Sequence, residues 1–165
     1  MKSEAARAEF TRNTEMIGKV FSINTSKSKG VSKMPVEKVK LIENYGLEND
    51  AHAGGGIKQV SLLSIESIKK QKECPKVDKK TELKAGDFAE NITTEGIKLD
   101  ELKIGDRLKI GKSVELEISQ IGKECHRYCS IYYRTGNCIM PKEGVFAKVI
   151  RGGEISRGEE IIIIR

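Results

Sequence analysis

Three of the chain's four cysteines and one of its two histidines lie in one short stretch, residues 120–141. They are Cys125, His126, Cys129 and Cys138. Lys123 and Arg127 place positive charge beside Cys125, and cationic neighbours lower the pKa of a free thiol from its usual value of about 8.5. The resulting thiolate can attack sulfur, carry a persulfide or bind a soft metal. The stretch therefore predicts sulfur or metal chemistry centred on Cys125, with His126 as a neighbour that tunes it.

Other chemistries fit the same residues less well. A structural zinc site usually needs two matched pairs of ligands, but here a Cys-x3-Cys pair is followed only by Cys138. A cysteine-protease arrangement would need His52 or His126 as its base, and no recognisable nucleophile turn is present. Buried cysteines can also serve simply as small apolar side chains. These three alternatives stay open beside the sulfur-chemistry prediction.

A second segment, residues 46–59, combines glycine with titratable side chains. Three consecutive glycines, Gly54 to Gly56, give the backbone freedom and let a ligand approach the main chain closely. They lie beside Asp50, His52 and Lys58. The segment lacks the Gly-Lys-Ser/Thr ending of a phosphate-binding Walker loop. It predicts either a flexible turn or a pocket wall with a titratable histidine.

Composition limits the class of protein. The chain has 165 residues, 33% of them charged, and a net charge of +6. The longest apolar run, Ile161 to Ile164, is far too short to span a membrane, and residues 1–16 have no signal-peptide core. We therefore expect a cytoplasmic protein without membrane contact, whose thiols stay reduced. The lysines are dispersed and aromatic residues are few, so binding of nucleic acid is disfavoured. The positive net charge more specifically indicates a pocket for a small anionic ligand.

The elements that must position these residues are mainly β-strands. Alternating apolar residues predict strands at residues 16–25, 36–43, 108–110 and 114–118, and a strand with a turn between residues 86 and 96. Ser64 is a candidate N-cap for a helix that Pro75 ends. Gly152-Gly153 predicts a hairpin between Ile150 and Ile155. We expect a frayed leader at residues 1–15 and a single β domain at 16–165.

Several motifs, in their order along the chain, resemble the MOSC domain, the family named after the C-terminal domain of molybdenum cofactor sulfurase. They are Gly46-Leu-Glu-Asn-Asp50-Ala-His52-Ala-Gly54, Gly86-Asp-Phe88-Ala-Glu90-Asn91-Ile-Thr93, Ile104-Gly-Asp-Arg-Leu108, Gln120-Ile-Gly-Lys-Glu-Cys125-His126, and Pro141-Lys-Glu-Gly144 with Gly152-Gly153. The resemblance implies a curved, mostly antiparallel β-barrel with a few short helices, which agrees with the glycine-punctuated strands.

The resemblance also assigns roles to residues. It maps the family's cysteine onto Cys125, as a persulfide carrier or a molybdenum ligand, and implies that Asp50, His52 and Asn91 line the same pocket. A molybdenum cofactor (molybdopterin) would then lie with its phosphate near Gly54, Gly55 and Lys58, with the cationic Lys123 and Arg127 nearby. Some family members accompany pyridoxal-phosphate domains, but this chain shows no lysine that would bind pyridoxal phosphate. The implied partners are a cysteine desulfurase or a molybdenum-cofactor enzyme.

Three hypotheses follow. In the first, Cys125 accepts sulfur and passes it to a molybdenum cofactor or another metal–sulfur assembly, which would make the protein a sulfurtransferase. In the second, the chain binds the cofactor, with Cys125 as metal ligand. In the third, a basic β-barrel binds RNA or a protein, and its cysteines are structural.

Overall fold

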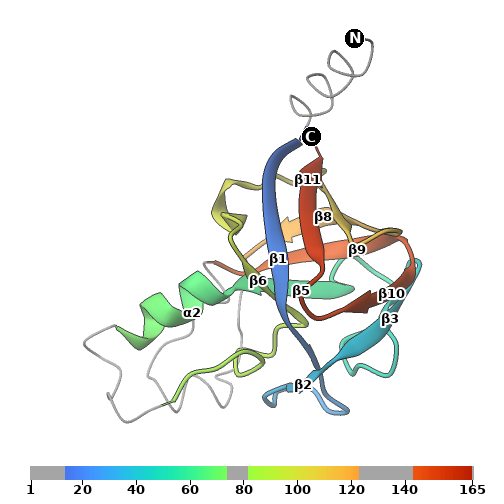
Figure 1. Ribbon diagram of the computed structural model, residues 1–165. Coiled ribbons are helices and arrows are strands. Elements are labelled where there is room, and N and C mark those ends of the chain that lie inside the picture. Colours follow the sequence, from blue (N-terminus) through green and yellow to red (C-terminus); the bar gives the residue numbers. More distant parts are fainter. Residues whose placement is uncertain (1–13, 74–81, 123–142, 165) are drawn as a thin grey trace.

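The computed structural model describes residues 14–73, 82–122 and 143–164. The strands are β1 (Thr14–Thr25), β2 (Met34–Val36), β3 (Lys38–Ile42), β4 (Gly46–Leu47), β5 (Val60–Ser64), β6 (Ile92–Glu95), β7 (Arg107–Ile110), β8 (Val114–Ile121), β9 (Val145–Arg151), β10 (Gly153–Ser156) and β11 (Glu160–Ile164). Between them lie the helix α2 (Ile65–Lys72) and the 3-10 turn η1 (Leu99–Glu101). Figure 1 shows the strands curving around a common interior, with α2 projecting from one side.

The main sheet closes into a barrel. Its strand order is β11-β7-β8-β9-β5-β6-β1-β2, and β1 also pairs with β11. β5 and β6 run parallel, and the other pairings are antiparallel. Closure depends on β1, which is long and irregular: its first part pairs with β11, and its last three residues pair with β2. The predicted mostly antiparallel β-barrel is therefore confirmed.

Alternating side chains fill the barrel. In β8, Val114, Leu116 and Ile118 are buried while the residues between them are half-buried, as the period of two requires. The same inward face on the other strands builds one large apolar cluster. A second, smaller cluster joins Leu63 and Phe146 to α2. The strands predicted at residues 108–110 and 114–118 are thus confirmed, and both contribute to the core.

The helix forms where the sequence predicts it. Ser64 caps α2, its hydroxyl accepting a hydrogen bond from the Ser67 amide at 3.0 Å. Ile65 and Ile68 turn toward the second apolar cluster. The helix ends at Lys72, three residues before Pro75, in accord with the bias of proline against the preceding helical turn.

The strand and turn predicted between residues 86 and 96 are confirmed: the strand is Ile92–Glu95, and a turn at residues 85–88 comes before it. Two other local predictions were wrong. The strand predicted at residues 36–43 is shorter, Lys38–Ile42, because Val36 belongs to β2 and the strand breaks at Glu37. Gly152-Gly153 is not a hairpin turn: β9 pairs with β8 and β5, whereas β10 pairs with β3. Residue 152 lies so close to β3 that a Cβ there would collide with the carbonyl oxygen of Leu41. Glycine has no Cβ and therefore permits this close approach.

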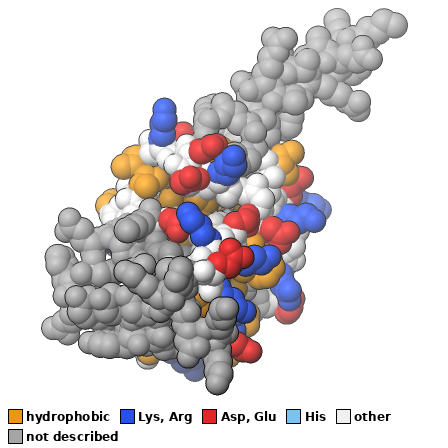
Figure 2. Space-filling view, turned by 90° about the vertical axis from the view of Figure 1, so that its left-hand side faces the viewer, with side chains coloured by type: hydrophobic (Ala, Val, Ile, Leu, Met, Phe, Trp, Pro, Cys, Tyr) orange, Lys and Arg blue, Asp and Glu red, His pale blue; other side chains and the backbone are white. Residues whose placement is uncertain are grey.

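The surface carries both signs of charge. On the described part of the face in Figure 2, lysine and arginine side chains alternate with aspartate and glutamate and do not gather into a patch of one sign. No helix within the described residues is long and apolar enough to span a membrane.

Candidate functional site

The predicted cysteine centre lies outside the described residues. Cys125, His126, Lys123 and Arg127 all fall within 123–142, and Cys74 falls within 74–81. Of the predicted site residues, the structure describes Asp50, His52, Gly54, Gly55, Lys58 and Asn91.

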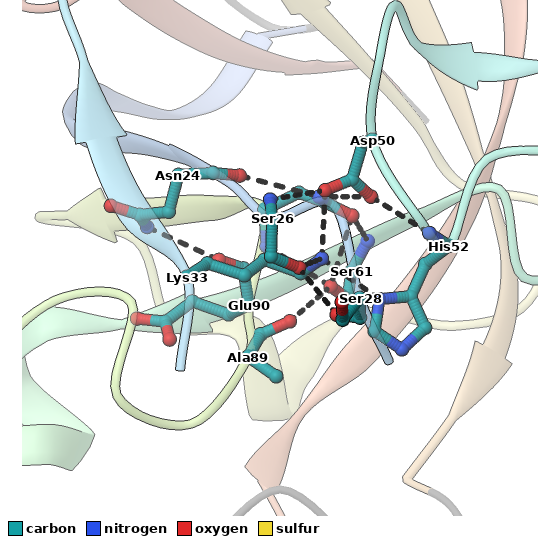
Figure 3. A network of polar contacts seen from close by, with 10 residues as sticks. Asn24, Ser26, Ser28, Lys33, Asp50, His52, Ser61, Ala89 and Glu90 are labelled. Carbon is teal, nitrogen blue, oxygen red and sulfur yellow. Dashed lines mark hydrogen bonds and ion pairs between the residues drawn. The ribbon is translucent and has the colours of Figure 1, made fainter. Parts of the chain in front are cut away.

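Asp50, His52 and Asn91 come together at one end of the barrel. Asn91, just before β6, donates from Nδ2 to the Asp50 carboxylate at 3.0 Å. The same carboxylate accepts from the His52 amide at 3.1 Å. Residues 41 positions apart in the sequence are thus joined through buried side chains. Figure 3 shows Asp50 and His52 at the edge of this network.

Lys33 completes the cluster and is the residue that the sequence did not indicate. Its ammonium lies 2.7 Å from Asp50 Oδ1, 2.8 Å from His52 Nδ1 and 3.0 Å from the Ser26 hydroxyl. The Lys33 and Asp50 side chains are 0% and 1% exposed. Figure 3 shows Lys33 reaching in beside Ser26, Asp50 and His52. A lysine in a loop of serines and lysines reads as a surface residue, and its local sequence holds no signal of burial.

The hydrogen-bonding capacity of Asp50 is fully used. Oδ1 accepts from Lys33 Nζ and from the Ser26 amide at 3.0 Å. Oδ2 accepts from the His52 amide and from Asn91 Nδ2. A carboxylate offers about four acceptor positions, so these four donors satisfy it. Asp50 thus ties together three chain segments, those of Lys33, His52 and Asn91.

Asn91 is saturated in the same way. Its Nδ2 donates to Asp50 and to the Asn24 carbonyl at 3.4 Å. Its Oδ1 accepts from both the amide and the hydroxyl of Ser61, at 3.0 and 3.1 Å. The amide therefore uses two donors and two acceptor positions. Because Ser61 belongs to β5, Asn91 fixes the loop carrying Asp50 against the sheet.

Burial and pairing change the pKa values of Asp50 and Lys33. Burial alone would raise the pKa of Asp50, but hydrogen bonds from Lys33, Asn91 and the Ser26 amide, with the Lys33 charge, lower it below its usual value. Burial lowers the pKa of Lys33 and outweighs the opposing hydrogen bond and charge of Asp50. The lowered pKa of Lys33 means that removing its ammonium from water is more unfavourable than the interaction with Asp50 is favourable. Such costly buried charge is more typical of functional sites than of ordinary cores.

A second polar layer adjoins the cluster at Glu90. Its side chain is fully buried, and Thr93 Oγ1 donates to Oε2 at 2.7 Å. Oε1 has no hydrogen-bond partner of normal geometry among the described residues. Burial raises the pKa of Glu90 to about 7, against the opposing effect of the Gly86 amide and the Thr93 hydroxyl. Asn24 connects the layers, donating to the Glu90 carbonyl and to Thr93.

The glycine segment is open. A Cβ added at Gly54, Gly55 or Gly56 would meet nothing within 4 Å. Gln59 fixes the end of the segment, donating to the Gly56 carbonyl at 2.8 Å and accepting from the Val149 amide at 3.0 Å. Lys58 lies with its ammonium 5.6 Å from the centre of the Phe146 ring. The segment is therefore held at its base and accessible along its backbone.

The ends of the cysteine segment attach close to this cluster. The Gly122 amide donates to the Gly144 carbonyl at 2.7 Å, so the described residues on either side of 123–142 lie next to each other. Two residues after Gly144, Phe146 pairs with Ser61, which binds Asn91.

The described residues also hold a cavity of 410 Å³ by the start of α2. Its lining includes Glu66, Lys70, Asp100 and Glu143, and none of the cluster residues. Across the described ranges, no group of three or more histidine, cysteine, aspartate or glutamate side chains is arranged to hold a metal ion.

Comparisons with known proteins agree with this architecture. The structure resembles that of the YuaD protein of Bacillus subtilis with a TM-score of 0.72 and 17% identity. The match covers 91% of this chain and 97% of YuaD. It resembles YiiM of Geobacillus stearothermophilus with a TM-score of 0.68 and 22% identity, over 90% of this chain and 75% of that one. For YiiM of Escherichia coli the TM-score is 0.65 and the identity 20%, over 90% and 70%. No curated protein sequence matches significantly.

The sequence carries the family assignment independently of these structures. The model of the MOSC domain family matches residues 49–162. That range includes Asp50, His52 and Asn91, and it also includes Cys125. The chain belongs to the MOSC domain family.

Proposed function

We propose that this protein carries sulfur on Cys125 for the maturation of a molybdenum cofactor or another metal–sulfur centre. The observation that supports the proposal most directly is the joining of Asp50, His52 and Asn91 into one cluster with Lys33. The described residues that flank the Cys125 segment adjoin β9, which pairs with β5, and Ser61 of β5 binds Asn91. The MOSC family is associated with molybdenum cofactor sulfurase-like function.

The sulfur-loading step needs only a persulfide donor. The Cys125 thiolate attacks the terminal sulfur of a donor R–S–SH, the donor S–S bond breaks, and R–S⁻ leaves. The new S–S bond is on Cys125, and the proton stays on the transferred sulfur. One S–S bond is lost and one is formed, so no external oxidant or reductant is required. A cysteine desulfurase is the class of partner that presents such a persulfide.

The cluster supports this step without taking part in the covalent chemistry. Asp50 and Asn91 have no hydrogen-bonding capacity left for a ligand, so we assign them to organising the pocket. His52 is half-buried, whereas Lys33, Asp50 and Asn91 are buried. It is therefore the residue we assign to contact with the transferred sulfur or its acceptor.

A second candidate function, stable binding of the cofactor, is favoured by the open glycine segment. The exposed backbone at Gly55 and Gly56 and the cation of Lys58 fit a phosphate group, whereas the amide of the half-buried Gly54 already donates to the Tyr45 carbonyl at 2.8 Å. When bound, the molybdenum cofactor would supply the metal on which sulfur or oxygen chemistry takes place, with Cys125 as its ligand. Protein purified from its native host should then contain molybdenum and show pterin fluorescence. The absence of both signals from carefully purified protein would exclude stable binding.

The sulfur-carrier proposal is tested by loading. The protein is incubated with a cysteine desulfurase and cysteine, then assayed for cyanide-releasable sulfur and for a mass increase of one sulfur atom. We expect Cys125→Ala to lose the loaded sulfur, while the matched variants Cys129→Ala and Cys138→Ala keep it. Loading of Cys125→Ala to the wild-type level would refute the proposal.

A further inference from the structure

The contacts of Lys33 use every hydrogen-bond donor that a lysine has. An ammonium has three N–H donors and no acceptor. Here they meet Asp50 Oδ1 at 2.7 Å, His52 Nδ1 at 2.8 Å and Ser26 Oγ at 3.0 Å. Lys33 therefore has nothing left to offer a phosphate or a substrate. Its contacts point to a role within the cluster.

The environment keeps Lys33 in its charged form. Asp50 is ionised, and its side chain is only 1% exposed. If Lys33 gave up its proton, the buried carboxylate would lose its counter-charge, which is strongly unfavourable. The ammonium therefore persists beside Asp50, although burial makes its charge costly.

A charged Lys33 decides which imidazole nitrogen carries the proton. Because the ammonium can only donate, His52 Nδ1 must accept. The imidazole is then neutral, with its proton on Nε2. An imidazolium would place a second positive charge within 2.8 Å of Lys33. The His52 amide is also bound, to Asp50 Oδ2 at 3.1 Å, so both the backbone and the ring are fixed.

We propose that Lys33 is the positioning residue for His52, holding it as the neutral Nε2–H tautomer so that it meets its ligand as a hydrogen-bond donor and not as a base. The class of ligand follows: a group that accepts a hydrogen bond, such as an anionic sulfur or oxygen. The ligand half of this inference rests on the proposed function, but the tautomer half does not.

The tautomer is measurable because the chain contains only two histidines, His52 and His126. The protein is labelled with ¹⁵N-histidine, and long-range ¹H–¹⁵N spectra are recorded near pH 8, above the ordinary histidine pKa of about 6.5. His126→Gln identifies the His52 signals. We expect His52 Nε2 to show the shift of a protonated nitrogen and Nδ1 that of an unprotonated one. A protonated Nδ1, or an imidazolium at this pH, would overturn the inference.

Lys33→Met tests whether Lys33 is the cause. Methionine keeps most of the apolar stem and removes the donors. We expect the His52 spectrum to change from a single Nε2–H form to a mixture, whereas Lys29→Met, an exposed lysine in the same loop, leaves it unchanged. An unaltered tautomer in folded Lys33→Met would refute the role of Lys33. If that variant does not fold, the wild-type spectrum still decides the tautomer. Neither readout depends on sulfur loading, so failure here is distinguishable from failure of the proposed function.

Discussion

Replacing Lys33 with methionine should destabilise the protein strongly. The side chain lies in a position that is 0% exposed, and its ammonium is the counter-charge for a carboxylate that is 1% exposed. Methionine is close in length to the lysine stem, so few apolar contacts are lost. The change therefore isolates the removal of one charge and its three hydrogen bonds.

The magnitude follows from the carboxylate that remains. Removing one partner of a buried ion pair typically costs about 3–5 kcal/mol, since the other charge stays buried and uncompensated. The hydrogen bond from Lys33 to Asp50 alone accounts for about 1.5–3 kcal/mol of this. Ser26 and His52 are half-buried, and water can replace their lost donor at small cost. We therefore expect the free energy of unfolding to fall by about 3–5 kcal/mol.

Urea denaturation followed by circular dichroism measures this loss. With a slope near 2 kcal/mol per molar urea, the midpoint should fall by roughly 2 M. Lys29→Met, in the same loop but exposed, should change the free energy of unfolding by no more than about 0.5 kcal/mol.

The pH dependence identifies the cause. In the wild type the folded-state pKa of Asp50 lies below its ordinary value of 3.8, so its stabilising contribution is present above that value and is lost as the pH falls through the folded pKa. In Lys33→Met the buried carboxyl loses its cation, and its pKa should rise instead. The variant then gains stability as Asp50 takes up a proton. We expect the gap between variant and wild type to narrow from pH 7 toward pH 4. A loss below about 1 kcal/mol, or a gap that does not narrow in acid, would refute the account.

Three further predictions concern the same region. Burial raises the pKa of Glu90 to about 7, so the folded state holds that proton more tightly than the unfolded state, and wild-type stability should fall by roughly 3 kcal/mol as the pH rises from 4.5 to 7. Glu90→Gln should remove this slope in urea titrations, and an unchanged slope would contradict it. His52→Gln, which keeps an N–H donor, should load sulfur at close to the wild-type rate while His52→Ala slows about tenfold or more; equal loss in both would favour a base. Gly86 has φ +91°, and a Cβ there would meet the Lys33 carbonyl oxygen. Gly86→Ala should therefore cost at least about 1 kcal/mol more than Gly30→Ala, which has φ +76° but open space around it, and equal midpoints in thermal melts would show that the contact relaxes freely.

The sequence determined the features that depend on short-range patterns. Alternation in residues 114–118 predicted β8, because a strand exposes its side chains with a period of two. Ser64 predicted the start of α2, because a cap acts within one helical turn. The order of the motifs indicated the MOSC family, and with it the candidates Asp50, His52 and Asn91. These predictions needed only the neighbours of each residue or the spacing between motifs.

The tertiary structure decided what depends on distant partners. β10 does not pair with β9 across the local Gly152-Gly153 turn but with β3, more than a hundred residues earlier, in a separate three-stranded sheet with β4. Lys33 sits among serines and lysines typical of an exposed loop, yet it is buried against Asp50 and His52, 17 and 19 residues away. A lysine is buried only where a counter-charge and acceptors are already in place. The segments that carry Ser26, Asp50 and His52 supply those partners when they pack around Lys33, and no local pattern around Lys33 records them.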